Sequence, residues 1–342
     1  MAQRSTWGTS DGRSVPLVRL DGPDGLSIEV IGYGAALRRL TVPGADGVPL
    51  DLCLGYDTLA QYETSDGCLG ATVGRYANRI AGASLPVGDK TFPLQANEGP
   101  NTLHSGSAGF HLRDWEIASV SADRAVFHLR SPHLDGGFPG NLDAWVSYAL
   151  LPGRQMEIRY EAVCDRDTAV NLTNHSYWNL SGHAGGSILD HRLTLFAEQY
   201  TPAGPDNIPT GALSPVAGTA LDFSVPHPVG ERIGDPMLSS ARGYDHNYVL
   251  PGDGLRRAAR LESPITGIVM ELSTTLPGLQ LYTANYLTDR PGKDGAHYRE
   301  RQGICLETQF YPDAVHHPAF PSPLLRAGER YSHRSVYTFS RV

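Results

Sequence analysis

Short apolar stretches with strand character recur along most of this chain, and glycine and proline separate them. The chain holds 38 glycines and 25 prolines among its 342 residues, and both residue types interrupt strands and form turns. Many of the stretches alternate apolar and polar residues and are rich in β-branched and aromatic side chains. Examples are residues 26–34, 125–131, 145–151, 155–163, 191–200, 268–275 and 279–286. This pattern predicts an all-β protein, built as a large antiparallel β-sandwich.

Three local predictions accompany this architecture. Pro152 and Gly153 lie between two strand-like stretches and predict a hairpin there. Residues 57–64 could form one short helix, and residues 85–113 are expected to form a long loop folded over one end, a kind of loop that is usually functional. Because no linker, repeat or charge run divides the chain, residues 1–342 are expected to form a single domain.

Charge and cysteine content exclude several classes of function. The formal net charge is −8 and the basic residues form no block, so neither a nucleic acid nor an acidic membrane is expected as partner. No apolar run resembles a signal peptide or approaches the roughly 20 residues of a membrane span, which favours a soluble, cytoplasmic protein. The widely spaced cysteines indicate buried reduced thiols, and the adjacent His316 and His317 lack ligand spacing, so no metal is expected.

A polar segment near the middle of the chain, Asn171 to Gly182, places His175 among amides, hydroxyls and two aromatic rings. Aromatic rings pack against the C–H groups of a sugar, and amides match its hydroxyls. Far downstream, Glu307 follows an apolar run, and a histidine with a carboxylate is a minimal acid–base pair. Taken singly, His175 could instead be a hydrogen-bonded core histidine, and Glu307 a strand-end carboxylate paired with an arginine.

Four further stretches carry polar groups among small or apolar neighbours: residues 70–83, 97–115, 241–250 and 276–287. Arg79 could bind a ligand or neutralise a structural acid, Asp245 could be a turn residue, and His104 could brace its glycine-rich loop. Of Tyr177 and Trp178, one must face the core if they lie on a strand. The candidate residues in these stretches are Arg75, Asn78, Arg79, His104, Asp245 and Gln280.

Six motifs in this order, from about residue 70 to 313, resemble the aldose 1-epimerase (galactose mutarotase) family. The resemblance implies a galactose-mutarotase-like supersandwich that interconverts the α- and β-anomers of free aldoses, such as galactose and glucose, without a cofactor. It implies that His175 is the general acid, which protonates the ring oxygen, and that Glu307 is the general base at the anomeric hydroxyl. It also implies that His104 assists near the ring oxygen, and that the substrate contacts come from Asn78, Arg79, His104, Tyr177, Asp245 and Gln280.

The chain departs from the family pattern at two places: Ser105 stands where glycine is common, and Phe310-Tyr311 where a polar residue and tryptophan often precede Pro-Asp. The chemistry leads us to expect His175 and Glu307 about 5–6 Å apart in one open pocket. We also expect the carboxylate to favour the charged form of His175, and Glu307 to be already ionised.

Three alternative functions remain open. A hexose-6-phosphate 1-epimerase would need an arginine cluster, for which Arg75 is the only spare candidate beside Arg79. A non-catalytic carbohydrate-binding protein would need neither member of the acid–base pair. A glycoside hydrolase would use Asp245 and Glu307 as paired carboxylates. The expected partner in the favoured case is a small sugar, and both a monomer and a homodimer are compatible with the sequence.

Overall fold

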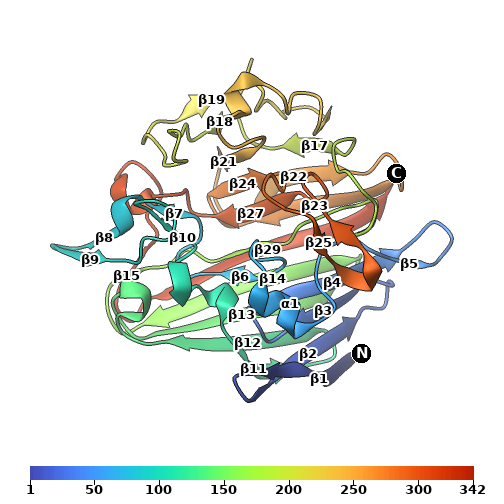
Figure 1. Ribbon diagram of the computed structural model, residues 1–342, viewed down its shortest axis with the longest axis horizontal. Coiled ribbons are helices and arrows are strands. Elements are labelled where there is room, and N and C mark those ends of the chain that lie inside the picture. The colour runs from blue at the N-terminus through green and yellow to red at the C-terminus, as the bar shows by residue number, and fades with distance from the viewer.

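Three antiparallel sheets carry most of the regular structure in the computed structural model, which describes residues 1–342 (Figure 1). The first has nine strands, in the order β11 (Glu116–Val120), β12 (Arg124–Ser131), β13 (Leu142–Leu151), β14 (Gln155–Cys164), β29 (Arg330–Arg341), β23 (Ile268–Thr274), β22 (Arg256–Glu262), β17 (Arg192–Leu195) and β20 (His227–Pro228). The second contains β1 (Ala2–Ser10), β2 (Arg13–Asp21), β3 (Ser27–Ile31), β4 (Ala36–Pro43) and β5 (Pro49–Asp51). The third contains β19 (Ser214–Pro215), β18 (Gln199–Tyr200), β21 (Asp245–Val249), β24 (Gly278–Tyr282) and β27 (Cys305–Gln309).

Shorter elements fill the connections. Five two-stranded ladders pair β6 (Thr72–Val73) with β16 (Thr173–Asn174), β7 (Arg79–Ile80) with β10 (Thr102–Leu103), β8 (Ser84–Val87) with β9 (Lys90–Pro93), β15 (Thr168–Ala169) with β28 (Leu324–Leu325), and β25 (Arg290–Pro291) with β26 (His297–Tyr298). The 3-10 turns are η1 (Ala81–Ala83), η2 (Gly106–Ala108), η3 (Phe110–Leu112), η4 (Asp135–Gly137), η5 (Pro236–Leu238), η6 (Lys293–Gly295) and η7 (Ala314–His316). The prediction of an all-β, antiparallel architecture is confirmed.

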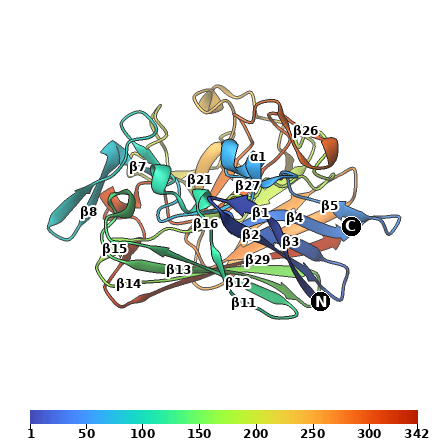
Figure 2. The same ribbon diagram turned by 60° about the horizontal axis from the view of Figure 1, so that its bottom comes forward.

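The alternating sequence pattern explains how the sheets pack. Along β14, Met156, Ile158 and Tyr160 point into the core while their neighbours are less buried, as the two-residue period of a strand requires. One cluster of 58 buried side chains draws on all three sheets. In Figure 2 the strands β1 to β4 lie over the broad sheet that contains β12, β13 and β14. The apolar faces of the sheets therefore share one core.

The predicted hairpin is confirmed: β13 and β14 pair across ten registered positions, and Gly153 takes a left-handed φ of 80° in the turn. The predicted helix is α1 (Leu59–Thr64), which begins later than expected because Thr58 caps it in a reciprocal capping box with Gln61. The expected loop over residues 85–113 was wrong in its first part. Leu85 pairs with Phe92 in the β8–β9 hairpin, whose turn at Gly88 is a short-range signal.

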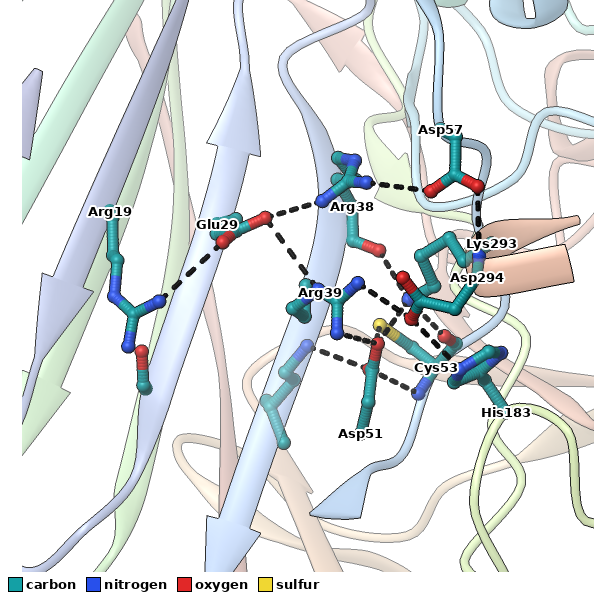
Figure 3. A network of polar contacts seen from close by, with 12 residues as sticks. Arg19, Glu29, Arg38, Arg39, Asp51, Cys53, Asp57, His183, Lys293 and Asp294 are labelled. Carbon is teal, nitrogen blue, oxygen red and sulfur yellow. Dashed lines mark hydrogen bonds and ion pairs between the residues drawn. The ribbon is translucent and has the colours of Figure 1, made fainter. Parts of the chain in front are cut away.

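A buried charge network joins the N-terminal sheet to the chain after β25 (Figure 3). The Lys293 ammonium is fully buried and donates to Asp51 Oδ2 (2.5 Å), the Cys53 carbonyl (2.7 Å) and the Arg38 carbonyl (2.8 Å). Arg39 approaches the same Asp51 carboxylate at 3.4 Å. An ammonium has three N–H donors, and each of them is satisfied here, which is the condition for burying a charge at tolerable cost.

The cysteines and the adjacent histidine pair can now be placed in the fold. All four cysteines are free thiols, and three of them are buried, whereas Cys68 is partly exposed. His316 and His317 both contact the Asp313 carboxylate, at 2.6 and 3.4 Å, and no group of three or more His, Cys, Asp and Glu side chains is arranged to hold a metal ion. None of the helices has the length and apolar character needed to cross a bilayer.

Candidate functional site

A cavity of about 430 Å³ lies where the third sheet meets the β6–β16 and β7–β10 ladders. In Figure 2, β16, β21 and β27 lie near one another at the centre of the molecule. Seven of the eight residues predicted for the site line this cavity: Asn78, Arg79, His104, Tyr177, Asp245, His175 and Glu307. The eighth, Gln280, lies outside the lining. Segments separated by more than 200 residues therefore converge on one place.

His175 and Glu307 face each other inside this cavity. His175 follows directly after β16, and Glu307 lies in the middle of β27. Their side chains are 8 % and 3 % exposed, and His175 Nε2 lies 3.6 Å from Glu307 Oε1. The separation is shorter than the 5–6 Å expected from the sequence because β16 packs directly against β27. At 3.6 Å the two groups are adjacent but too far apart for a formed hydrogen bond.

Aromatic rings surround the His175 imidazole. The Tyr177 ring stacks on it with a centroid separation of 5.1 Å and an interplanar angle of 26°. Tyr282 and His104 present their rings edge-on to it at 6.2 and 5.6 Å. Trp178, the next residue after Tyr177, instead packs on Tyr337 in the core, because successive side chains of an extended segment point to opposite sides.

Burial shifts the proton affinities of both members of the pair, against the expectation from the sequence. Desolvation lowers the pKa of His175 to about 4, so the imidazole is neutral near pH 7. Desolvation and the nearby Asp245 raise the pKa of Glu307 well above its usual range, and Arg79 opposes them. The expectations of a charged His175 and an already ionised Glu307 were wrong, because loss of hydration is the largest influence on the pKa of each group.

His104 is held by the backbone of the β7–β10 ladder. Asn78 has a left-handed φ of 64°, and its N–H donates to His104 Nδ1 at 3.1 Å. A backbone N–H can only donate, so Nδ1 carries no proton, and a neutral His104 carries its proton on Nε2. Burial and the nearby His175 keep the pKa of His104 well below its usual value. His104 therefore braces its loop, one alternative from the sequence, and keeps an N–H donor for other use.

Arg79 is the only lysine or arginine in the cavity lining, and carboxylates already engage it. Glu98 accepts from Arg79 Nε at 2.6 Å and from Nη2 at 2.8 Å, a bidentate pair. Asp245 lies 3.9 Å from Arg79 Nη1. Arg79 therefore neutralises acidic side chains, the second of the two roles that its sequence context suggested. Its side chain also borders the cavity.

Gln280 supports Asp245 from outside the cavity. Its amide donates to Asp245 Oδ1 at 2.6 Å, and Asp245 is paired in register with Tyr282 on the same two strands. The structure therefore places Gln280 behind the lining, where it orients a carboxylate, and not where the sequence resemblance put it. A residue on a central strand can sit on the face of the site without reaching the cavity, which strand periodicity alone does not reveal.

Comparison with known proteins identifies the family of the chain. The family model described as aldose 1-epimerase matches residues 16–338. The chain belongs to the aldose 1-epimerase family. Galactose mutarotase from Mus musculus is 40 % identical over 319 residues, covering 93 % of this chain and 92 % of the relative, and aldose 1-epimerase from Escherichia coli K12 is 36 % identical over 334 residues, covering 96 % of both.

Solved structures give the same assignment. A GalM/aldose epimerase homologue from C. elegans superposes with a TM-score of 0.89 at 32 % identity, covering 95 % of this chain and 99 % of the other. Galactose 1-epimerase from Lactobacillus acidophilus gives a TM-score of 0.88 at 26 % identity, covering 100 % and 99 %. The predicted family and supersandwich fold are confirmed, and the protein is an isomerase of the epimerase class.

The two departures from the family pattern leave the cavity intact. Ser105 takes a left-handed φ of 65°, where glycine is favoured, but its hydroxyl accepts from Tyr76 N at 2.9 Å and donates to Tyr76 O at 3.2 Å. These two bonds compensate for the conformation. Phe310 and Tyr311 do not line the cavity, and Tyr311 packs on Phe320, so they change no surface that a ligand would contact there.

Arg75 is not available for a phosphate. Its guanidinium is buried and donates to Ser131 Oγ (2.8 Å) and to the carbonyls of Ser131, Pro132, Pro139 and Gly140 at 2.7 to 3.1 Å. It lies outside the cavity lining. The arginine cluster that a hexose-6-phosphate epimerase of this design would need is therefore absent from the cavity, which instead contains Arg79 together with four acidic residues, Asp66, Glu98, Asp245 and Glu307.

Several residues of the site were not found from the sequence, among them Tyr282, Glu98 and Cys305. Glu98 lies six residues before His104, in a loop whose path no local pattern specifies. Cys305 lies two residues before Glu307, and its Sγ is 3.6 Å from His175 Nδ1. The two-residue period of a strand places Cys305 on the same face as Glu307, so this residue had a usable signal in the sequence, whereas Glu98 had none.

Proposed function

We propose that this protein interconverts the α- and β-anomers of free aldoses such as galactose and glucose, with His175 as general acid and Glu307 as general base. The observation that carries the proposal is the 3.6 Å approach of His175 Nε2 to Glu307 Oε1 inside a cavity. Ring opening needs one proton on the ring oxygen and one proton off the anomeric hydroxyl, and adjacent acid and base groups supply both. Rotation about C1–C2 by about half a turn and reclosure invert the anomeric centre.

The acid–base pair of His175 and Glu307 holds a single mobile proton in this scheme. Before ring opening the proton is on His175 and Glu307 is a carboxylate; after it the proton of the anomeric hydroxyl is on Glu307 and the imidazole is neutral. The first arrangement contains two charges and the second contains none. Because burial disfavours charge, the resting pair is the uncharged one, with the proton on Glu307, and this proton passes to His175 Nε2 before the ring opens.

The remaining polar side chains hold the sugar while C1 stays free to rotate. We assign Arg79, Asn78 and Asp245 to hydroxyls remote from C1, His104 Nε2–H to a bond near the ring oxygen, and Tyr177 to an apolar face of the sugar. Gln280 acts indirectly, through Asp245. Arg79 is already paired with Glu98, so a neutral hydroxyl suits this surface better than a phosphate, whose charge the Glu98 and Asp245 carboxylates would repel.

Polarimetry with freshly dissolved sugars tests the function. The protein is expected to accelerate the decay of optical rotation of α-D-galactose and α-D-glucose to the equilibrium value, and to act far less on glucose 6-phosphate. A preference for the phosphorylated sugar would reverse the substrate assignment. If the protein binds sugar but does not accelerate anomer exchange, it is a non-catalytic carbohydrate-binding protein. Release of reducing ends from a disaccharide would indicate a glycosidase.

The pH dependence of kcat/KM is expected to be bell-shaped. Below about pH 4 the imidazole gains a proton as well, so the pair holds two protons and has no base. At alkaline pH the pair loses its one proton and has no acid. Because burial raises the pKa of Glu307, the alkaline limb should lie well above the pKa of an exposed glutamate, about 4.3. The measurement is the catalysed rate from pH 3.5 to 9.5 after subtraction of the buffer rate; a flat profile would contradict a paired acid and base.

We further propose that residues 1–342 act as one domain, since one hydrophobic cluster draws on all three sheets. The cytoplasmic location stays a prediction from the sequence, as does the choice between monomer and homodimer.

A further inference from the structure

Both ring nitrogens of His175 face the same strand. On β27, Cys305 and Glu307 are two residues apart and project from one face of the sheet. Cys305 Sγ lies 3.6 Å from His175 Nδ1, and Glu307 Oε1 lies 3.6 Å from His175 Nε2. A separation of 3.6 Å is normal for a hydrogen bond to the larger sulfur atom. The imidazole therefore spans the gap between a thiol and a carboxyl group of one strand.

The neighbouring rings hold the imidazole in this orientation. Tyr177 stacks on one face and Tyr282 approaches edge-on, and both His175 and Cys305 are buried. A rotation of the ring about its Cβ–Cγ bond would break the contact with sulfur and move Nε2 away from Glu307. Which nitrogen carries the proton of the neutral ring then depends on what each nitrogen faces.

We propose that Cys305 is a positioning residue for His175: its sulfur accepts a hydrogen bond from Nδ1–H and leaves the Nε2 lone pair directed at Glu307 and the sugar. The inference rests on the proposed function, because the proton that shuttles to and from the ring oxygen must use Nε2. When His175 gives up that proton the neutral ring retains its proton on Nδ1, and only an acceptor beside Nδ1 suits this tautomer. When Glu307 is protonated, its O–H points toward Nε2, and Nε2 can accept from it only if it carries no proton.

A thiol suits this place because it orients the ring without stabilising its charge. A carboxylate beside Nδ1 would favour the imidazolium and make His175 a weaker acid. Sulfur is a weak acceptor, and burial keeps the pKa of Cys305 well above its usual value, so the thiol stays neutral. The ring is thus aligned, and it remains acidic enough to protonate a weakly basic ether-type oxygen.

Nitrogen NMR of the intact protein tests the tautomer directly. Long-range ¹H–¹⁵N correlation at pH 7, on protein labelled at its histidines, distinguishes a protonated ring nitrogen from an unprotonated one, and the spectrum of His175→Gln identifies the signals of His175. We expect Nδ1 protonated and Nε2 unprotonated in the wild type. We expect the same tautomer in Cys305→Ser, because a hydroxyl also accepts, and a mixture of tautomers in Cys305→Ala.

Kinetics supply the second measurement. Cys305→Ala is expected to lower kcat about tenfold with KM unchanged within about twofold, the low end of the effect seen when the partner that orients a metal-bound histidine is removed, while Cys305→Ser keeps most of kcat. Cys164→Ala is the matched control, since Cys164 is buried outside the cavity lining and its thiol bonds the Pro139 carbonyl, and it should match the wild type in both measurements.

A neutral wild-type His175 with its proton on Nε2 and none on Nδ1 would overturn the inference, as would an Ala variant with an unchanged tautomer and unchanged kcat. If Cys305→Ala does not fold, the wild type and Cys305→Ser still decide, because both must show Nδ1 protonated. The failure of the proposed function would look different: the wild type would then accelerate no anomer exchange, whatever the tautomer of His175.

Discussion

Glu307→Gln is expected to lower kcat for anomer interconversion by about a hundred- to ten-thousandfold, the usual contribution of a positioned base. The amide keeps the size of the carboxyl group and can still accept or donate hydrogen bonds, but it cannot take the proton of the anomeric hydroxyl. Polarimetry on α-D-galactose measures the rate. Sugar binding, followed by titration calorimetry, should persist within a few-fold because Arg79, Asn78 and Asp245 are unchanged.

The same variant should remain folded and gain stability relative to the wild type as pH rises. The folded-state pKa of Glu307 is raised by burial, so above the usual pKa of about 4.3 the unfolded chain releases this proton more readily than the folded one. Stability is therefore lost in the wild type between that value and the raised folded-state pKa. Glutamine has no such proton, so thermal melts at pH 5 and pH 8 should show a growing advantage for Glu307→Gln.

A second buried carboxylate provides the control for this variant. Glu157 on β14 is 3 % exposed, lies outside the cavity, and pairs with Arg334 at 3.1 Å and Arg159 at 3.4 Å. Glu157→Gln should lose stability and retain kcat, the opposite of the result for Glu307→Gln. Near-normal turnover by a folded Glu307→Gln protein would end the assignment of Glu307 as the base.

Lys293→Met should destabilise the fold by about 3 kcal/mol, because removing one partner leaves a buried charge unpaired. Asp51 is 6 % exposed and would lose its ammonium partner at 2.5 Å, and the carbonyls of Arg38 and Cys53 would lose their donor. Arg39, at 3.4 Å from Asp51, keeps the cost at the low end. Equilibrium unfolding in urea measures it.

An exposed pair with similar spacing is the comparison. Arg257 and Glu271 are 2.9 Å apart with side chains 58 % and 42 % exposed, so Arg257→Met should change stability by only about 0.5 kcal/mol. Adding Asp51→Asn to Lys293→Met should recover part of the loss, because the unpaired charge is then gone. Equal effects of Lys293→Met and Arg257→Met would show that the network of Figure 3 contributes no more than a surface ion pair.

The strand pattern predicted the architecture because burying one face of a sheet leaves a two-residue signature in the sequence. The β13–β14 hairpin and the closing strand β29 follow it. Residues 85–93 did not stand out, because β8 and β9 are four-residue strands that include Pro86 and Pro93, and proline argues against a strand. Boundaries set by caps, such as Thr58 for α1, were likewise found only approximately.

The sequence by itself determined the chemical groups of the site: which histidine, which glutamate and which polar residues the chain carries, in an order that resembles one family. The tertiary structure decided how those groups behave. Burial beside β27 made His175 neutral and raised the proton affinity of Glu307, and it brought Cys305 to Nδ1, Glu98 to Arg79 and Gln280 to Asp245. Proton affinity depends on hydration and on neighbours in space, and neither is written in the order of residues along a chain.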